Sequence, residues 1–528
     1  MRLDDWFLEA SERGNPHATV RPWSEGNRVE VLVHGAAYFA RLHDELCAMA
    51  PGDWIHFTDW RGDPDQRLTD DPRSAIARVL AGLAERGVHV RGLVWRSHPD
   101  QAHFSEQENL HLVETINDAG GEVLLDERVV RAGSHHQKLF VIRHAGRHDD
   151  DVAFVGGIDL CHGRRDDHRH VGDPQPIELE GDYGPHPAWH DAQLEVHGPA
   201  VGDLARTFRE RWEDPTPIDH RNPLRRWLRR RASEPSSPDP LPPPPPDPAP
   251  AGPHAVQVLR TYPARRPRYP FAPDGERSIA HAYFKAFRRA RRLIYVEDQY
   301  LWSSDAAEAL VDALERAPEL RIVAVVPRHP DRDGALTGPP YRIAQNEAME
   351  RVEAAGGDRV MVLDLEAESG RPVYVHAKVC IIDDVWMIVG SDNLNRRSWT
   401  NDSELSCAVL DSTLDEREPR DPAGLGDHAR RLPRDTRLRL WCEHLGRDDE
   451  KVEDLLDPVE GAEVLRRSAQ DLADWDAKGR SGARPSGRVR IHRAEPVPTW
   501  AQVWARPLYR TLVDPDGRPW RLRRRGEY

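Results

Sequence analysis

Short apolar runs alternate with amphipathic stretches along most of the chain. Trp54 to Thr58 and Leu293 to Glu297 are dense in apolar residues over five positions, which predicts buried strands. Apolar positions with helical spacing precede each run, and a further helix and strand follow it, over residues 74–95 and 305–326. The pattern predicts an α/β protein.

This order of elements occurs twice, about 240 residues apart. Ala-Tyr-Phe opens comparable helical patterns at residues 37–39 and 282–284, and a later helix in each copy ends in Ala-Gly-Gly, at 119–121 and 355–357. A nearly constant offset indicates a duplicated half rather than a solenoid with a short period. The length of 528 residues suits two domains, each large enough to bury its own core.

Proline marks the boundary between the halves. Residues 233–253 contain five consecutive prolines, and a segment of this composition is expected to be an extended linker. The expected divisions are a first half over residues 1–232, the linker over 233–253, a second half over 254–447 and a C-terminal extension over 448–528. The second half is expected to close with a strand over Thr436–Trp441, where apolar residues alternate with arginine.

The candidate chemistry is concentrated in a predicted hairpin of the second half. Apolar runs flank a tight turn at Asp383, so His376 and Lys378 stand at alternate positions and point to the same face. Ser391 and Asn393 follow the second strand beside Gly390, where a slim backbone and a neutral amide suit a phosphate oxygen. These groups are the parts that phosphoryl transfer needs.

A second copy of this motif lies in the first half, with His136, Lys138 and, further on, Gly156-Gly157-Ile158-Asp159. His-x-Lys, four residues, Asp, six residues, Gly-Ser-x-Asn resembles the signature of the phospholipase D superfamily, and the block from Pro187 to Leu194 resembles phospholipase D proper. Enzymes of this superfamily build one active site from two such motifs. The resemblance implies two homologous α/β/α sandwich halves that form a pseudo-dimer with one shared active site.

The resemblance also implies a two-histidine mechanism. One imidazole attacks phosphorus to form a phosphohistidine, and the other protonates the leaving alcohol and then deprotonates the incoming water or alcohol. Relatives usually attack with the first-motif histidine, which implies His136 as nucleophile and His376 as acid and base, although the sequence alone does not order the two. No metal and no other cofactor is expected, because lysines neutralise the phosphate. The groups expected to hold the non-bridging oxygens are Lys138, Lys378, Ser391 and Asn393.

Each imidazole also needs a partner for its second nitrogen, commonly a carboxylate. Asp191 follows His136 at a position equivalent to that of Glu404 after His376. We predict Asp191 and Glu404 as the orienting groups. The neighbouring residues His135 and His190 are not included in the catalytic set, and Gln299 or Tyr300 either lines the substrate pocket or only ends a strand.

The first motif departs from the pattern at its turn. Arg143 stands where the second copy has Asp383, and the stretch up to Asp151 is about six residues longer. Asp383 is expected to order the backbone of the turn rather than touch phosphate, so this departure does not affect the catalytic His and Lys. In the first motif Asp149, Asp150 or Asp151 is expected to take the role of Asp383. Asp159 stands where the second copy has Asn393, in a Gly-Gly-Ile-Asp form that relatives often show, and is expected to be a structural part of the motif.

Composition narrows the partners and the location. A formal net charge of −15 argues against a nucleic-acid partner. Five scattered cysteines suggest neither a disulfide framework nor a zinc site. Neither an apolar leader nor a window of 18 apolar residues is seen, so a cytoplasmic protein is expected, either free or peripheral on the membrane. A monomer is also expected. The basic, Trp-containing stretches at 225–231 and 519–525 are either contacts for anionic lipid at a membrane surface or solvated charge runs.

By resemblance, the chain is expected to be an enzyme, a phosphodiesterase of the phospholipase D type. It would hydrolyse the headgroup phosphodiester of a phospholipid to phosphatidic acid, with water as acceptor or an alcohol in transphosphatidylation. A cardiolipin synthase-like phosphatidyltransferase, another phosphodiesterase and a non-catalytic membrane-binding scaffold are the alternatives.

Overall fold

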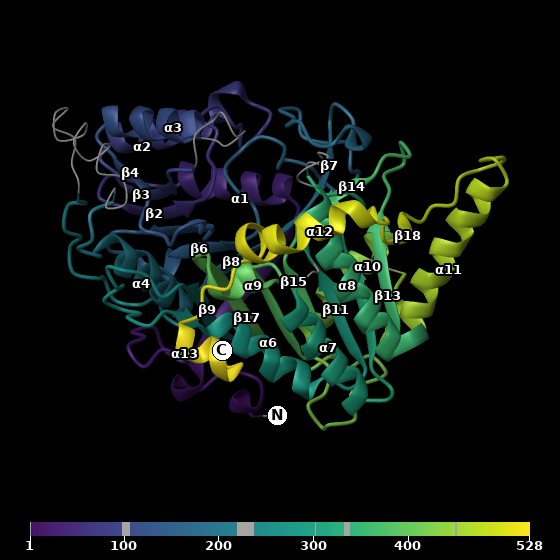
Figure 1. Ribbon diagram of the computed structural model, residues 1–528. Helices are drawn as coiled ribbons and strands as arrows, with labels where there is room; N and C mark the ends of the chain where they lie inside the picture. Colours follow the sequence, from purple (N-terminus) through teal and green to yellow (C-terminus); the bar gives the residue numbers. More distant parts are fainter. Residues whose placement is uncertain (1, 98–105, 219–236, 301–302, 332–337, 449–450) are drawn as a thin grey trace.

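A computed structural model of the chain describes residues 2–97, 106–218, 237–300, 303–331, 338–448 and 451–528 (Figure 1). The strands of the first half are β1 (Ser24–Val33), β2 (Trp54–Asp59), β3 (His89–Trp95), β4 (Glu122–Asp126), β5 (Leu139–Arg143), β6 (Val152–Gly156), β7 (Ala188–His190) and β8 (Ala192–His197). Those of the second half are β9 (His254–Tyr262), β10 (Glu276–Arg277), β11 (Leu293–Glu297), β12 (Arg321–Val325), β13 (Val360–Leu365), β14 (Val373–Val375), β15 (Val379–Ile382), β16 (Trp386–Gly390) and β17 (Glu404–Asp411). The C-terminal extension adds β18 (Val489–Ile491).

The helices follow the duplication as well. The first half contains α1 (Gly35–Cys47), α2 (Ile76–Glu85), α3 (Glu106–Asp118) and α4 (Ala200–Trp212). The second half contains α6 (Ser278–Arg289), α7 (Ser304–Arg316), α8 (Gly338–Gly356), α9 (Arg396–Thr400) and α10 (Arg431–His444). The extension contains α11 (Pro458–Ala477), α12 (Thr499–Leu508) and α13 (Trp520–Arg525).

The two halves share one hydrogen-bonded sheet and the same topology. Its order is β18-β13-β12-β11-β15-β16-β17-β9 in the second half and continues as β1-β8-β6-β5-β2-β3-β4 in the first. In each half three parallel strands are followed by four antiparallel ones. The halves join where β1 pairs with β9 in antiparallel fashion, at Ser24 with Val256 and at Asn27 with His254. The predicted α/β fold of two similar halves is confirmed.

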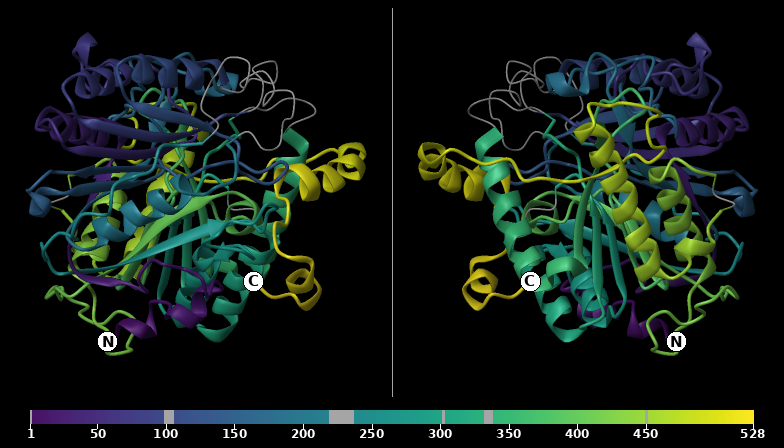
Figure 2. Two further views of the ribbon diagram at one scale, coloured as in Figure 1. Left: turned by 90° about the vertical axis from the view of Figure 1, so that its left-hand side faces the viewer. Right: turned by 90° about the vertical axis from the view of Figure 1, so that its right-hand side faces the viewer.

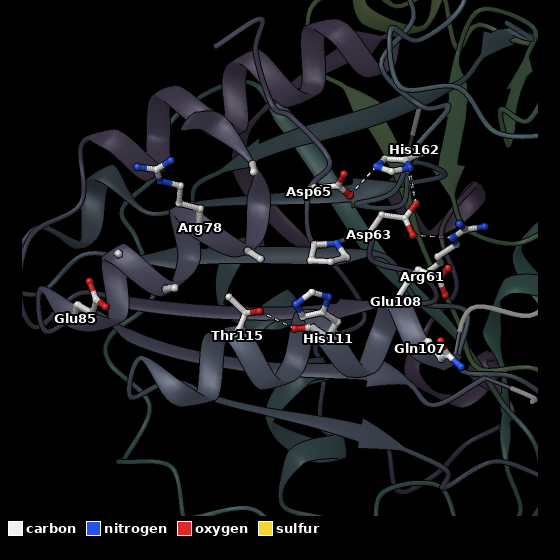
Figure 3. A pocket seen from close by; sticks show the side chains of 15 residues that line it. Arg61, Asp63, Asp65, Arg78, Glu85, Gln107, Glu108, His111, Thr115 and His162 are labelled. Atoms are coloured by element: carbon white, nitrogen blue, oxygen red, sulfur yellow. Dashed lines mark hydrogen bonds and ion pairs between the residues drawn. The ribbon is translucent and has the colours of Figure 1, made fainter. Parts of the chain in front are cut away.

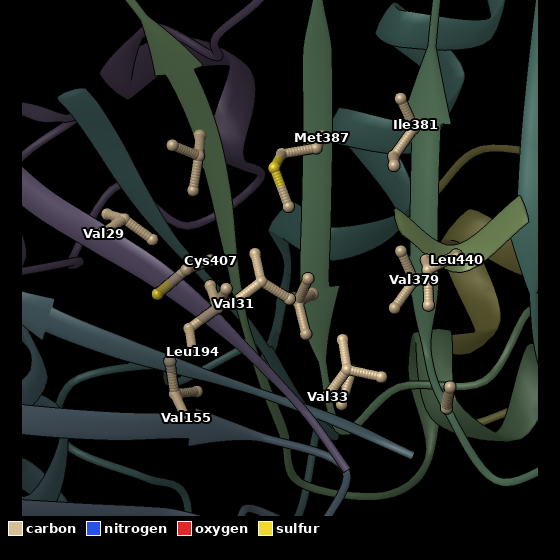
Figure 4. Packing of buried hydrophobic residues seen from close by; sticks show 14 of the residues in the cluster. Val29, Val31, Val33, Val155, Leu194, Val379, Ile381, Met387, Cys407 and Leu440 are labelled. Carbon is tan, nitrogen blue, oxygen red and sulfur yellow. The ribbon is translucent and has the colours of Figure 1, made fainter. Parts of the chain in front are cut away.

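The inner faces of the two halves pack against each other around one hydrophobic core. Val31 and Leu194 of the first half belong to the same cluster as Val379 and Met387 of the second (Figure 4). Strand β6 contacts β16 and β17 across this core, and α4 and α10 contribute further apolar side chains to it. The outer faces are covered by α1, α2 and α3 in the first half and by α6, α7 and α8 in the second. In each half the sheet therefore has helices on both faces, with α1, α2 and α3 or α6, α7 and α8 outside and α4 or α10 beside the shared core; Figure 2 shows the molecule from two sides.

The strand predicted over Thr436–Trp441 is wrong, because these residues lie within helix α10. Arg434 and Arg437, one helical turn apart, both bind the buried carboxylate of Asp384, with Nε to oxygen distances of 3.0 and 2.6 Å. An alternation of arginine and leucine over only six residues fits both the two-residue period of a strand and the 3.6-residue period of a helix. Ion pairs with a distant carboxylate, which the local pattern cannot show, accompany the helix.

The proline-rich segment follows the surface of the first half. Residues 237–253 form no helix or strand, and Trp212 Nε1 donates to the Asp239 carbonyl at 2.8 Å. Arg143 donates to the Pro246 carbonyl at 2.5 Å. The start of the expected linker and the basic stretch at 225–231 lie outside the described residues.

The extension packs on the second half. Strand β18 pairs with β13 at the edge of the sheet, and α12 packs on α8. Among the helices that the structure describes, none combines the length and the apolar character that crossing a bilayer requires.

Candidate active site

The predicted hairpin of the second motif consists of β15 and β16. Asp383 and Asp384 occupy its turn with φ angles of 52° and 56°, a left-handed conformation that Asp tolerates better than most residues. The Asp383 carboxylate accepts hydrogen bonds from the backbone N–H groups of Arg291, Arg292 and Leu293, each at 2.8 Å. Burial raises the pKa of Asp383 to about 6. Its contacts hold the start of β11 to the turn.

Each His-x-Lys motif is hydrogen-bonded to the opposite half of the chain. The backbone N–H of His376 donates to the His190 carbonyl at 2.8 Å, directly after β14 pairs in parallel with β7. The backbone N–H of His136 donates to the Ser403 carbonyl at 2.9 Å, one residue before Glu404. These short strand-like contacts bring the segment that carries each carboxylate to the histidine of the other half.

The two imidazole–carboxylate pairs therefore cross between the halves. His136 Nδ1 lies 2.9 Å from Glu404 Oε2, and His376 Nδ1 lies 2.7 Å from Asp191 Oδ2. The carboxylate side chains are fully buried, whereas the His136 and His376 side chains are 15% and 7% exposed. Because each carboxylate engages Nδ1, the Nε2 atom is the nitrogen left for chemistry.

Different groups hold the two carboxylates. Ser391 Oγ donates to Glu404 at 2.5 Å, and Trp189 Nε1 donates to Asp191 at 3.2 Å. The Ser391 hydroxyl thus contacts a carboxylate, which differs from the phosphate contact expected from the sequence. Gly157 stands at the position of Ser391 in the first half, and a Cβ there would lie 2.3 Å from Asp191 Oδ1. A side chain at that position would collide with the orienting carboxylate.

Each lysine donates to the backbone carbonyl of the histidine in its own motif, but the side-chain partners of the two lysines differ. Lys138 Nζ lies 3.1 Å from Asp159 Oδ1, and both side chains are buried. Lys378 Nζ instead donates to Gln299 Oε1 at 3.4 Å, and burial lowers its pKa to about 8. Asn393, at the position equivalent to Asp159, is buried and has a side-chain oxygen with no hydrogen-bond partner among the described residues. The acid of the first half is therefore an ion-pair partner, and its counterpart in the second half is a neutral amide.

The lysine of each motif acts electrostatically on the histidines of both motifs. Burial, followed by the neighbouring lysines Lys138 and Lys378 respectively, holds the pKa values of His136 and His376 well below their usual value. The charge of Lys378 also acts on His136, and that of Lys138 acts on His376. Burial raises the pKa of Asp191 and raises that of Glu404 to about 8. Burial thus disfavours the charged forms of both imidazoles and of both carboxyl partners.

The longer turn of the first motif is ordered by Asp151. Its Oδ2 accepts from Arg143 Nε at 2.5 Å, and its Oδ1 accepts from the His144 N–H at 2.6 Å. Asp151 is fully buried, whereas the Asp150 side chain is 57% exposed. Of the three acids considered from the sequence, Asp151 is the one that holds this turn, and the insertion leaves the first pair intact.

Several neighbours of the site carry little sequence signal. The Trp60 and Trp189 rings lie 6.1 and 5.0 Å from the imidazoles of His136 and His376. The Arg164 guanidinium lies 3.9 Å from the centroid of the Trp189 ring, and its charge acts on His376. Arg164 follows Asp159 in an irregular loop, so no periodicity could have identified it.

A matched pair of acids was also missed. Asp59 is the last residue of β2, and Asp298 directly follows the equivalent strand β11. They accept from the N–H groups of Leu160 and Leu394, both at 2.9 Å. Those N–H groups come directly after Asp159 and Asn393. Burial raises the pKa of Asp298 to about 7 and that of Asp59 well above its usual value. The sequence could have indicated these residues, because an aspartate stands at the equivalent position of both halves.

A cavity of about 990 Å³ lies elsewhere in the first half, between α2, α3 and the loop after β2. Arg61, Asp63 and His162 line it, and His162 Nε2 lies 2.9 Å from Asp65 (Figure 3). None of the predicted site residues lines this cavity. The site that contains His136 and His376 is therefore separate from this cavity.

Two family models match the chain. The one described as "Phospholipase D" matches residues 60–222, and the one described as "Cardiolipin synthase, PLD-like domain" matches residues 283–417. Each match contains one His-x-Lys motif, and together they span more than half of the chain.

Curated relatives agree with these matches. Phospholipase D2 of Bos taurus is 26% identical over 87% of this chain and 57% of its own length. Phospholipase D alpha 1 of Arabidopsis thaliana is 26% identical over 80% of this chain and 65% of its own length. The chain thus spans less than two thirds of the length of these relatives.

Among solved structures, the phosphatidylserine synthase of Haemophilus influenzae Rd KW20 superposes with a TM-score of 0.49 at 13% identity, over 72% of this chain and 82% of that one. Nuc from Salmonella typhimurium, a phospholipase D family member, covers 30% of this chain and 84% of its own with a TM-score of 0.21 at 21% identity. Neither score reaches 0.5, so the family assignment rests on the duplicated motifs, the family matches and the curated relatives. On those grounds the chain belongs to the phospholipase D superfamily.

Proposed function

We propose that this chain is a phosphodiesterase of the phospholipase D type that hydrolyses the headgroup phosphodiester of a phospholipid to phosphatidic acid. The observation that carries the proposal is the crossed pair of imidazole–carboxylate contacts, His136 with Glu404 and His376 with Asp191. Two imidazoles, each held at Nδ1 and flanked by a lysine, are what a double displacement at phosphorus requires.

In the first step Nε2 of one histidine attacks phosphorus, and the bond from phosphorus to the headgroup oxygen breaks. The second histidine gives its proton to the departing oxygen. In the second step that histidine takes a proton from water, the hydroxide oxygen attacks phosphorus, and the phosphorus–nitrogen bond breaks to release phosphatidic acid. An alcohol in place of water yields a phosphatidyl alcohol. By resemblance we assign His136 as the nucleophile and His376 as the acid and base.

The resting site favours a neutral nucleophile, since burial and the lysines lower the pKa of both imidazoles. A bound phosphodiester anion opposes the lysine charges, which favours the imidazolium form that the acid needs. Lys138, Lys378 and the Asn393 amide are assigned to the non-bridging oxygens. Ser391 is assigned to holding Glu404, given the bond between them.

We also infer that the chain meets its substrate at a membrane surface through α12. Ala501 and Ala505 of this helix are buried, whereas Trp500 and Val503 are 67% and 80% exposed. Helix α12 projects from the body of the protein (Figure 2). An apolar helix face with exposed Trp is typical of a segment that inserts into the interface of a bilayer.

The basic end of the extension adds charge to this surface. Trp520 of α13 is 69% exposed and is followed by Arg521 and by the exposed arginines at 523–525. The extension is tied to the site segment, because Asp514 accepts from the Arg397 N–H at 2.6 Å, between Asn393 and Glu404 in sequence. We therefore assign anionic phospholipid as the favoured surface.

The test is headgroup release from vesicles of phosphatidylcholine, phosphatidylethanolamine and phosphatidylglycerol with a primary alcohol present. The wild type is expected to form phosphatidic acid and phosphatidyl alcohol, and His136→Ala and His376→Ala are expected to form neither. Mass spectrometry of protein quenched in base identifies the phosphorylated histidine, because phosphohistidine survives base. Absence of turnover of every lipid by the wild type would contradict the proposal.

A phosphatidyltransferase is the second candidate, favoured by the match of residues 283–417 to the model described as "Cardiolipin synthase, PLD-like domain". Vesicles of phosphatidylglycerol alone separate the two activities. Release of glycerol with formation of cardiolipin would identify the transferase, whereas phosphatidic acid as the main product would identify the hydrolase. Vesicle binding without either product would favour the non-catalytic scaffold.

A further inference from the structure

A second cluster of histidines lies beside the candidate active site. It consists of three imidazoles and one carboxylate from four separate segments: His34 after β1, His170 in the loop between β6 and β7, His190 at the end of β7, and Glu443 in α10. The imidazole side chains are no more than 2% exposed, and that of Glu443 is 9% exposed. The candidate mechanism uses none of these four side chains.

The four groups converge on one point. Glu443 Oε2 lies 2.9 Å from His34 Nε2, and Glu443 Oε1 lies 3.1 Å from His170 Nε2 and 3.3 Å from His190 Nδ1. All the facing nitrogen and oxygen atoms lie within 4.8 Å of one another. Ligands about 2.0–2.2 Å from a four-coordinate zinc ion lie roughly 3.3 Å from each other, so small rotations of the side chains would bring this set to bonding distance.

The nitrogen of His190 that faces away from the cluster, Nε2, contacts a carboxylate, as is common for metal-bound histidines. His190 Nε2 lies 2.7 Å from Glu297 Oε2, while Nδ1 of the same ring faces Glu443. On the opposite side, His170 Nδ1 lies 3.9 Å from the Asp166 carboxylate. Carboxylates behind ligating imidazoles fix the ring orientation and increase its basicity toward a metal ion.

The charges of the cluster also call for a cation. Glu297 and Glu443 are buried carboxylates, and the partners that the described residues offer them are imidazoles and the Tyr295 hydroxyl. Two buried negative charges need either two imidazolium rings or one divalent cation.

We propose that His34, His170, His190 and Glu443 bind one divalent transition-metal ion, with zinc as the best match to three imidazole nitrogens and one carboxylate oxygen. The ligand set fills four positions in a buried place, so the ion is structural. Through its four ligands the ion would link the end of β1, the loop before β7, β7 itself and α10.

The proposed metal site adjoins the segment that carries Asp191 of the candidate active site. The His190 carbonyl accepts the N–H groups of His376 and Ala377, and Asp191 is the next residue. A metal on the His190 ring would fix the segment that carries the carboxylate facing His376. The cluster residues are therefore positioning residues, and their effect on the reaction passes through Asp191.

The test begins with the wild-type chain of residues 1–528, purified without chelator and then dialysed against buffer containing zinc and afterwards against buffer without it. Mass spectrometry of the metal content is expected to give about one zinc per chain. Cobalt in place of zinc is expected to give the intense visible absorption of a four-coordinate ion. A wild-type protein that keeps well under one equivalent of either metal would overturn the proposal.

Variants locate the ion. His34→Ala and Glu443→Gln are each expected to lower zinc affinity at least 100-fold. His197→Ala is the matched control, because His197 forms a buried pair with Glu195 at 2.7 Å outside the cluster. Retention of stoichiometric zinc by both cluster variants would overturn the assignment.

A measurement on the wild type alone covers the case in which the variants do not fold. A strong chelator is expected to lower the melting temperature, and added zinc is expected to restore it. An unchanged melting temperature after complete removal of bound metal would contradict the structural role. These readouts need no lipid substrate, so their outcome is separate from that of the proposed activity.

Discussion

His376 Nδ1, in the second half of the chain, lies 2.7 Å from Oδ2 of Asp191, in the first half. The reciprocal contact joins His136 to Glu404 at 2.9 Å. Neither half by itself contains a complete pair of the candidate site, although each contributes one imidazole and one carboxylate to it. The shared site thus depends on the junction of the halves at the level of single hydrogen bonds.

Asp191→Asn is expected to lower kcat by about 10²–10⁴-fold with little change in KM, because an amide cannot hold the His376 imidazole in the same charge state. With His136 as nucleophile, this variant should slow the breakdown of phosphohistidine as well as its formation, since His376 is the base of the second step and the acid of the first. Glu404→Gln should slow the formation of phosphohistidine. Steady-state kinetics and quenched mass spectrometry measure both effects.

Asp182→Asn is the control for these variants, because the Asp182 side chain is 69% exposed in the same half. It should leave the kinetics unchanged. Wild-type kinetics in Asp191→Asn would remove the carboxylate from the mechanism.

Activity is expected to fall as the pH rises through about 8. Burial lowers the pKa of Lys378 to about 8, and only the protonated ammonium neutralises a phosphate oxygen. In Lys378→Arg the guanidinium stays charged, so the alkaline fall should move to higher pH even though the maximal rate is lower. Lys285→Arg, at a surface ion pair with Glu12, is the control that should leave the profile in place. An alkaline limb still near pH 8 in Lys378→Arg would assign it to another group.

Asp151→Ala is expected to lower the free energy of unfolding by about 3–5 kcal/mol, because it leaves the buried Arg143 guanidinium without its carboxylate. Asp150→Ala, one residue earlier and mostly exposed, should change it by less than about 0.5 kcal/mol. Urea denaturation of the two variants measures the contrast. Equal small effects would show that the longer turn does not depend on Asp151.

The double variant Trp500→Ser with Val503→Ser is expected to reduce binding to anionic vesicles at least 10-fold, because it removes two exposed apolar side chains from α12. Turnover of a short-chain phospholipid below its micelle concentration should remain near wild type. Sedimentation with vesicles and a soluble-substrate assay measure the two quantities.

The matched control replaces Ile491, which is 45% exposed on β18, with serine. It should leave vesicle binding unchanged. Undiminished vesicle binding by the α12 double variant would show that another surface meets the lipid.

Much of the site could be predicted from the residues themselves. The repeated motif predicted His136, Lys138, His376 and Lys378 as site residues, and the equivalent positions of Asp191 and Glu404 predicted both as orienting acids. In the structure each of these two carboxylates contacts an imidazole. Their crossing could not be predicted, because it follows from the pairing of β7 with β14 and of His135 with Ser403, which join segments far apart in sequence. The spacing of residues in the sequence predicts that each histidine has a carboxylate partner, but it does not show which half of the chain supplies that carboxylate.

Other features depended on tertiary contacts. The arginines of α10 alternated as if in a strand, and their shared partner Asp384 lies some 50 residues earlier. Ser391 looked like a phosphate ligand because of its motif position, yet its hydroxyl donates to Glu404. The cluster around Glu443 gave no signal at all, since its histidines come from three unrelated segments with no metal-binding spacing.

The crossing of the two pairs also matters while the chain is being made. Glu404 lies 268 residues after His136, and His376 lies 185 residues after Asp191. A ribosome that has finished the first half has therefore produced one imidazole and one carboxylate that cannot meet their partners. A polypeptide released before residue 376 contains neither finished pair, so synthesis itself delays assembly of the site until Glu404 has been translated.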